Sequence, residues 1–299
     1  SGFGSTKLEY KLLNCNDKWN LLWFSVKRFL PLYIDETIKI LTLHYNHGQF
    51  LHGENDSNYD IRIYKDSGTS VQSILNVVKT KFFRVNLFQK IVNHLTLHGY
   101  RDKIDLINLS YDFRKFPRET FEAPLDNFKF RTAQRSFELT THLYPSKIGW
   151  NETEILVKTD YKNYTLQNLE EFHNDINYNE GYLRYTSVQS VTDYSFKPGI
   201  ETHCLYGTGV NTKAFMDYRG KNFPDQAPKI RFGNGDGTVN DVSLSYCQGW
   251  NNTFVESFKG VNHRKLLENT GVINYISRLI DIPPLKKRNI SSLLKKLKI

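Results

Sequence analysis

The chain has 299 residues, of which 39% are hydrophobic and 14% aromatic, and this composition excludes a disordered body. No apolar run reaches the length of a membrane-spanning helix, and three cysteines are too few for a disulfide-rich scaffold. Six of the nine net positive charges lie in residues 285–299, so the nearly balanced remainder argues against a nucleic-acid-binding face.

The first third of the chain predicts short apolar elements followed by a longer helix. The segment Trp19–Leu43 is rich in large apolar residues, and Pro31 divides it into two elements because proline interrupts a helix. In Val85–Leu97 the apolar positions follow helical spacing, and Gly99 fits a C-terminal cap.

A buried strand is predicted at Ile104–Leu109, just after that helix. A helix followed by a buried strand indicates an α/β sheet of parallel character. Later in the chain, strands are expected at Thr202–Tyr206, Ile230–Phe232 and Thr253–Phe258, and a helix at Val272–Ile280. Polar loops follow these strands, and open α/β folds keep their sites at such positions.

The most informative loop is Phe232-Gly-Asn-Gly-Asp236-Gly-Thr-Val-Asn240, where an aspartate stands between two glycines. A Gly-Asp turn is one interpretation, and from this loop alone it is the favoured one. A calcium loop is another, but its sixth position is Val239 instead of glycine and its twelfth is Ser245 instead of glutamate. The metal interpretation therefore fails, and no metal or cofactor is expected.

His263 follows Asp236 by 27 residues and comes just after a predicted strand. The order acid, then histidine, is the one that closes a Ser-His-Asp site in an α/β hydrolase. The acid would orient the imidazole, and the histidine would act as general base and then general acid. Among the nine histidines, His263 alone stands in this relation to an aspartate loop.

Several motifs occur in a fixed order along the chain: Gly2-Phe3-Gly4-Ser5, Tyr111-Asp112-Phe113-Arg114, Arg131-Thr-x-Gln-Arg135-Ser-Phe, Trp150-Asn-Glu-Thr153, His203-Cys-Leu-Tyr-Gly-Thr-Gly-Val210, Phe223-Pro-Asp225, the Asp236 loop and Cys247-Gln-x-Trp250. This series resembles the lecithin:cholesterol acyltransferase and lysosomal phospholipase A2 family, and it is nearer to the phospholipase branch. Asn234 replaces an aspartate that lies outside the triad of that family.

The resemblance implies an α/β-hydrolase fold over residues 1–284, with cap and membrane-binding segments at about 13–50 and 130–200 and a basic amphipathic tail at 285–299. It gives Asp236 the role of triad acid, His263 that of triad base, and the backbone N–H of Phe3 that of an oxyanion-hole donor. Because the chain opens inside this loop, we expect the natural N-terminus to lie upstream.

The resemblance also implies a disulfide between Cys204 and Cys247. The second bridge of the family is expected to be broken, because Cys15 fits one half while Glu36 occupies the other. Six Asn-x-Ser/Thr sequons favour a glycoprotein of the secretory route, lysosomal or secreted. They begin at Asn55, Asn108, Asn151, Asn163, Asn251 and Asn289.

The nucleophilic serine is the missing part. The family carries it in an elbow between the Tyr-Asp-Phe-Arg and Arg-Thr-x-Gln-Arg motifs, but here only a short join of about Phe116–Lys129 separates them. No Gly-x-Ser-x-Gly occurs, and Gly68-Thr-Ser-Val-Gln72 stands in the wrong order. A skipped exon or faulty gene model, a splice isoform and a pseudoenzyme lineage all account for this gap, and the intact acid and base favour the first.

Three functions compete. The first is an enzyme that cleaves an acyl ester of a glycerophospholipid and passes the acyl group to water or a lipid alcohol. This chain would be inactive as written, because it lacks the nucleophile. The second is a non-catalytic pseudoenzyme that binds lipid or membrane surfaces. The third, a secreted structural or interaction glycoprotein, has only the sequons in its favour.

Two segments are candidates for contact with an anionic membrane surface. In the first, Trp19, Leu22, Trp23 and Phe24 carry large apolar side chains, although a core-packed cap explains them equally well. In the second, the tail 285–299 would form a short helix with a basic face and an apolar stripe. A frayed soluble end is the alternative for the tail. The oligomeric state is left open.

Overall fold

The computed structural model describes residues 6–14, 18–23, 25–45, 54–64, 88–107, 114, 127–191 and 197–285. Some features expected from the sequence lie outside these residues: Phe3, Cys15, Phe24, Asn108, Asn289, residues 116–126 of the short join and the tail from Lys286 onward. The described residues form helices and sheets together, so the fold class is mixed α/β.

The N-terminal part builds a three-stranded antiparallel sheet from β1 (Leu8–Leu12), β2 (Asn20–Trp23) and β3 (Tyr59–Ile63), in the order β2-β1-β3. Leu8 and Tyr10 of β1 are buried, because alternate side chains of a strand point to the same face. A short 3-10 helix (Val26–Phe29) and α1 (Ile34–Leu41) follow β2 and cover this face.

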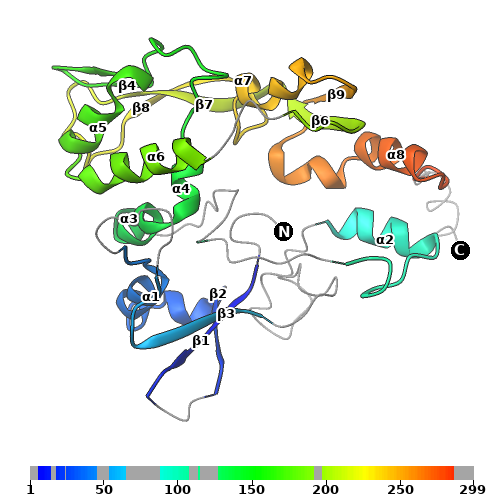
Figure 1. The fold of residues 1–299 in the computed structure, drawn as a ribbon, viewed down its shortest axis with the longest axis horizontal. Helices are drawn as coiled ribbons and strands as arrows, with labels where there is room; N and C mark the ends of the chain where they lie inside the picture. The colour runs from blue at the N-terminus through cyan, green and yellow to red at the C-terminus, as the bar shows by residue number, and fades with distance from the viewer. Residues whose placement is uncertain are drawn as a thin grey trace, which may run out of the picture.

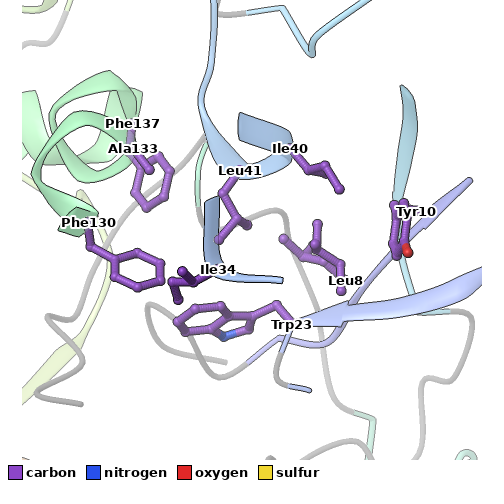
Figure 2. Close-up of a cluster of buried hydrophobic side chains, with 10 residues drawn as sticks. Leu8, Tyr10, Trp23, Ile34, Ile40, Leu41, Phe130, Ala133 and Phe137 are labelled. Carbon is purple, nitrogen blue, oxygen red and sulfur yellow. The ribbon is translucent and has the colours of Figure 1, made fainter. Parts of the chain in front are cut away.

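Figure 2 shows the core that this sheet shares with α1 and α3 (Asn127–Ser136). Ile34, Ile40 and Leu41 form the buried face of α1, at a spacing typical of an amphipathic helix. The other buried members of the cluster are Leu8, Tyr10, Leu22, Trp23, Phe130, Ala133 and Phe137. Segments about 100 residues apart in the sequence, within the two expected cap regions, therefore meet in one core.

A second sheet has the order β5-β4-β7-β8, where β4 (Val157–Lys158) pairs parallel with β7 (Val210–Asp217) and β7 pairs antiparallel with β8 (Lys229–Gly235). The edge strand is β5 (Asn163–Tyr164). α4 (Glu138–His142), a 3-10 turn (Leu166–Asn168), α5 (Leu169–Asp175) and α6 (Asn179–Val191) pack beside this sheet (Figure 1).

The third sheet has two strands, β6 (Thr202–Thr208) and β9 (Thr253–Lys259), which pair in parallel along their whole length. α7 (Asp241–Leu244) and a 3-10 turn (Tyr246–Gly249) lie between β8 and β9 in the chain. A 3-10 segment (His263–Glu268) and α8 (Thr270–Leu279) follow β9, and α2 (Gln89–Leu97) lies next to them (Figure 1).

Most of the expected elements are present, within a few residues. β6, β8, β9 and α8 cover the strands and the helix predicted in the last third of the chain. α2 covers the described part of the helix predicted before Gly99, whose φ of 97° matches its expected capping position.

The strand predicted at Ile104–Leu109 is wrong over its described residues. Residues 101–107 form turns instead, in which the Arg101 carbonyl accepts the N–H groups of residues 104, 105 and 106. Ile104 and Ile107 are each 58% exposed. An apolar run becomes a buried strand only where neighbouring strands and helices cover it, and over these four residues none of the described elements does so.

Candidate active site

The loop after β8 buries Asp236 and fixes its carboxylate. The Asp236 side chain is 2% exposed, and its Oδ1 accepts the backbone N–H groups of Thr238 (3.0 Å) and Val239 (2.8 Å). Gly237 has a φ of 89°, a conformation that favours glycine. The Gly237 N–H in turn donates to the hydroxyl of Thr212 on β7 (2.8 Å). This turn leaves the second carboxylate oxygen, Oδ2, directed at a different partner.

That partner is His263, whose Nδ1 lies 2.5 Å from Asp236 Oδ2. The backbone adds a second link, because the His263 N–H donates to the Asp236 carbonyl (2.8 Å). His263 opens the 3-10 segment after β9, and the side chain of Asn262 caps this segment by accepting the Lys265 N–H (3.1 Å). The structure thus brings together the two residues expected to form the acid–base pair.

Gly207 allows the two loops to meet. A Cβ on Gly207 would lie 2.0 Å from the Val261 carbonyl oxygen and 3.4 Å from the Cβ of Asp236. Since real Cβ atoms do not approach other atoms to 2.0 Å, a side chain there would displace the backbone two residues before His263. The glycine in the middle of the His203–Val210 motif therefore serves the close approach of β6 to the His263 loop.

Two opposing effects act on the pKa of Asp236. Burial raises the pKa of its carboxyl, whereas hydrogen bonds from the His263 ring and from the N–H groups of Val239 and Thr238 lower it. The hydrogen bonds outweigh the burial, so the pKa is below its ordinary value. Asp236 is therefore an ionised acceptor at neutral pH, able to hold the Nδ1–H tautomer of His263 and to stabilise its protonated form.

Asn234 has a structural role beside this pair. Its amide donates to the Asp241 carboxylate and to the Thr208 hydroxyl (3.2 Å), and its carbonyl oxygen accepts the Gly209 N–H (2.9 Å). The Thr208 hydroxyl also reaches Asp241 Oδ2 (2.8 Å). The Asn234 side chain, on β8, therefore hydrogen-bonds both to the β6–β7 turn and to the carboxylate of Asp241, the first residue of α7.

Cys204 and Cys247 form a disulfide with Cα atoms 6.4 Å apart, the pairing that the family resemblance implies. The bond links β6 to the 3-10 turn after α7, and Gln248 donates to the Tyr206 hydroxyl beside it (2.7 Å). Glu36, which stands where the second bridge is expected to be broken, instead pairs with Arg28 (2.6 Å).

Three supporting residues escaped the sequence analysis: Gly207, Thr212 and Asn262. Gly207 and Thr212 act through the approach of a distant segment, which a single sequence does not display, whereas Asn262 caps the segment that directly follows it. Gly207 lies inside β6, and its place in the Tyr206-Gly-Thr-Gly209 motif is the one local signal that could have found it. Within the described ranges no three His, Cys, Asp or Glu residues are grouped so that they could hold a metal ion.

The membrane contact expected at Leu22 and Trp23 needs correction. Both side chains are buried in the core, 0% and 7% exposed, because β2 turns them toward α1 and β1. The Arg62 guanidinium stacks on the Trp19 ring, with Arg62 Cζ 3.8 Å from the centroid of that ring. Among the described helices, none has the length and apolar character needed to cross a bilayer.

The family model of lecithin:cholesterol acyltransferase matches residues 19–122 and 177–265, which together make up more than half of the chain. The chain belongs to this family. Both members of the Asp236–His263 pair fall inside the second matched segment.

Curated proteins with phospholipase or acyltransferase names also match the chain. The lysosomal phospholipase A and acyltransferase of Bos taurus is 36% identical over 159 residues, 52% of this chain and 39% of that protein. The lecithin-cholesterol acyltransferase-like 1 of Arabidopsis thaliana is 34% identical over 176 residues (58% and 40%). The phosphatidylcholine-sterol acyltransferase of Gallus gallus is 29% identical over 149 residues (48% and 36%). The matches thus span about two fifths of these relatives' length.

Proposed function

We propose that this chain carries the acid–base half of a Ser-His-Asp site for phospholipid acyl transfer or hydrolysis, on an α/β-hydrolase scaffold. The observation that carries the proposal is the 2.5 Å contact between Asp236 and His263 on two loops that follow strands. The names of the relatives, phospholipase A and acyltransferase, supply the substrate class. Glycerophospholipid is the acyl donor, and water or a lipid alcohol is the acceptor.

In this proposal His263 moves the proton. Asp236 accepts the Nδ1–H, so Nε2 is the nitrogen that takes a proton from a serine hydroxyl and later returns one to the leaving alcohol. The positive charge that forms on the ring lies beside the ionised Asp236 carboxylate. Phe3, outside the described residues, would supply one N–H to the oxyanion.

The nucleophile itself is absent from the sequence, so we propose that the chain as written does not catalyse acyl transfer. In the family, the serine elbow is expected between the positions of Arg114 and α3. This chain is expected to be several dozen residues shorter there. Without the elbow there is neither an acyl-enzyme nor the second oxyanion donor, which is the N–H after the serine.

In the part of the chain that the structure describes, the two-stranded β6–β9 sheet supports the proposal that a neighbouring strand is missing. Parallel sheets are normally covered on both faces and rarely stop at two strands. Here Phe254 is 52% exposed and Val255 39% exposed on the edge strand β9. A further parallel strand and its helix would cover these side chains, as an α/β-hydrolase sheet requires.

A lysosomal or secreted location fits the same proposal. The relatives named lysosomal support it, as does the disulfide, since such bonds persist in oxidising compartments. Asn151, Asn163 and Asn251 are exposed and can accept a glycan, whereas the Asn55 side chain is partly buried and accepts a hydrogen bond from Arg114. An anionic membrane surface remains the proposed partner of the tail.

The decisive experiment restores the missing segment. Residues 115–126 would be replaced by the corresponding segment of the bovine relative, and fatty acid release from phosphatidylcholine vesicles measured. We expect activity and fluorophosphonate labelling in the restored protein, and neither in the chain as written. His263→Ala in the restored protein should lower the rate by on the order of a thousandfold or more, whereas His98→Ala, at the C-cap of α2, should leave it unchanged.

Two outcomes would contradict the proposal: deacylation by the unrestored chain, or full activity of the restored His263→Ala protein. Because the nucleophile is missing, a non-catalytic lipid-binding protein is the second candidate. Vesicle binding by the chain as written, together with an inactive but folded restored protein, would favour it.

A further inference from the structure

A cavity of about 190 Å³ lies between α3, α5 and the far end of β7. Its walls are apolar and aromatic: Phe172 and Ile176 come from α5 and its C-cap, Met216 from β7, and Phe223 from the loop before β8. Val210, at the other end of β7, bridges to Asp236, so roughly 20 Å of strand separates the cavity from the acid–base pair. In Figure 1, α5 and α7 accordingly lie at opposite ends of the β7–β8 pair.

Two arginines line this otherwise apolar cavity. Arg131 and Arg135 are four residues apart on α3, so their side chains leave the helix on one face. Arg131 already binds a carboxylate, that of Asp225, with Nη1–Oδ1 at 2.7 Å. Across the described residues, the Arg135 guanidinium makes no ion pair and no side-chain hydrogen bond, and lies 5.2 Å from the Tyr178 ring.

The electrostatics of Arg135 favour an anion. Burial lowers the pKa of its guanidinium, and the neighbouring charge of Arg131 lowers it further. A guanidinium nevertheless keeps its proton in proteins, so the cavity holds a partly dehydrated cation. Among the described residues, Asp225 is the acid whose charge acts on Arg135, and its carboxylate is already paired with Arg131. A carboxylate supplied by a ligand would pair with Arg135.

We propose that this cavity binds a single-chain amphiphilic carboxylate, with its head on Arg135 and its chain along Phe172, Ile176 and Met216. Guanidinium and carboxylate groups match in geometry and form bidentate pairs. An apolar cavity of about 150 Å³ accommodates benzene, so this one fits a chain of roughly six to eight carbons. The inference does not depend on acyl transfer by this chain, and it stands or falls separately from the proposed function.

Calorimetric titration of the full chain with octanoate, methyl octanoate and octyl phosphate tests the assignment. Octanoate should bind, and methyl octanoate, which has the same chain without the charge, should bind at least tenfold more weakly. Equal affinity for the acid and its ester would overturn the role of Arg135. Tighter binding of octyl phosphate than of octanoate would overturn the carboxylate as the preferred head group.

Variants locate the site. Arg135→Gln should weaken octanoate binding at least tenfold, whereas Arg101→Gln, which removes the same charge from an exposed pair with Asp105, should not. Met216→Trp should abolish binding by filling the cavity, with circular dichroism reporting that the protein is folded. If Arg135→Gln does not fold, the affinities of the unmodified chain for octanoate and methyl octanoate still decide whether a charged head group is recognised. Unchanged octanoate affinity in folded Arg135→Gln or Met216→Trp protein would refute the site.

Discussion

At the scale of single residues, Asp236 and His263 could be paired from the sequence because each follows a strand and their order matches one type of site. The residues that hold this pair in place could not be predicted. Thr212 receives the Gly237 N–H only because β7 lies beside β8, and Gly207 matters only because Val261 approaches it. These are consequences of tertiary packing, and neither residue has a chemical type that marks it.

The lowered pKa of Asp236 leads to a pH-dependent stability. A carboxyl whose pKa is lower in the folded protein stabilises it above the unfolded pKa, near 3.8, and this contribution is lost as the pH falls through the folded pKa. Asp236→Asn should therefore lower the free energy of unfolding by about 1–3 kcal/mol near pH 6. The difference between the two proteins should shrink below pH 4.

Urea denaturation between pH 3 and pH 7 measures this effect. Asp35→Asn on the exposed face of α1 gives the background change for losing one carboxylate. A destabilisation by Asp236→Asn that is constant over the whole range would mean that ionisation of Asp236 is not its source.

At the scale of elements, local patterns predicted β6, β8, β9 and α8 because their apolar positions are regular and their ends are marked by Gly and Asn. They missed β7, where polar side chains interrupt the apolar ones: Thr212 is buried on one face while Met216 is 40% exposed. They also failed at Ile104, because an apolar run carries no information on whether another strand lies beside it.

The Asn234 contacts give a testable link between three elements. Asn234→Asp would place two carboxylates in contact, at positions 234 and 241, and we expect a loss of about 1 kcal/mol at pH 7, small because the site is largely exposed. The double variant Asn234→Asp/Asp241→Asn, which exchanges the amide and the carboxylate, should recover most of the lost stability. Thermal unfolding of the three proteins at pH 7 and pH 4 provides the measurement.

The loss should be smaller at pH 4, because protonation of the introduced carboxyl relieves the repulsion. If the double variant were as unstable as the single one, the hydrogen bond between positions 234 and 241 would not account for the presence of asparagine here.

At the scale of the whole molecule, the order of motifs predicted the family, and the family model agrees. What it could not supply is which strands pair with one another in the described part of the chain. In the structure β6 and β9 pair with each other, and large apolar side chains on β8 and β9 remain exposed: Phe232 by 57% and Phe254 by 52%. Such a surface promotes association between molecules.

We therefore expect the purified chain to bind the dye ANS and to associate with rising concentration. Phe254→Ser should reduce both effects without changing the far-ultraviolet spectrum, and Leu279→Ser, at the C-terminal end of α8, controls for the loss of any exposed apolar side chain. Fluorescence titration and sedimentation velocity report the two effects. A strictly monomeric chain without dye binding would show that the β6–β9 sheet is covered.

The close approach at Gly207 also bears on inherited variation. Every single-nucleotide change that converts a glycine codon to another amino acid introduces a side chain, and each of those side chains begins with the Cβ for which position 207 has no room. Gly199 and Gly249, by contrast, have open space around them and ordinary backbone angles. A missense change at codon 207 thus displaces the loop that carries His263. At codon 199 or 249 the added Cβ has no atom within 4 Å.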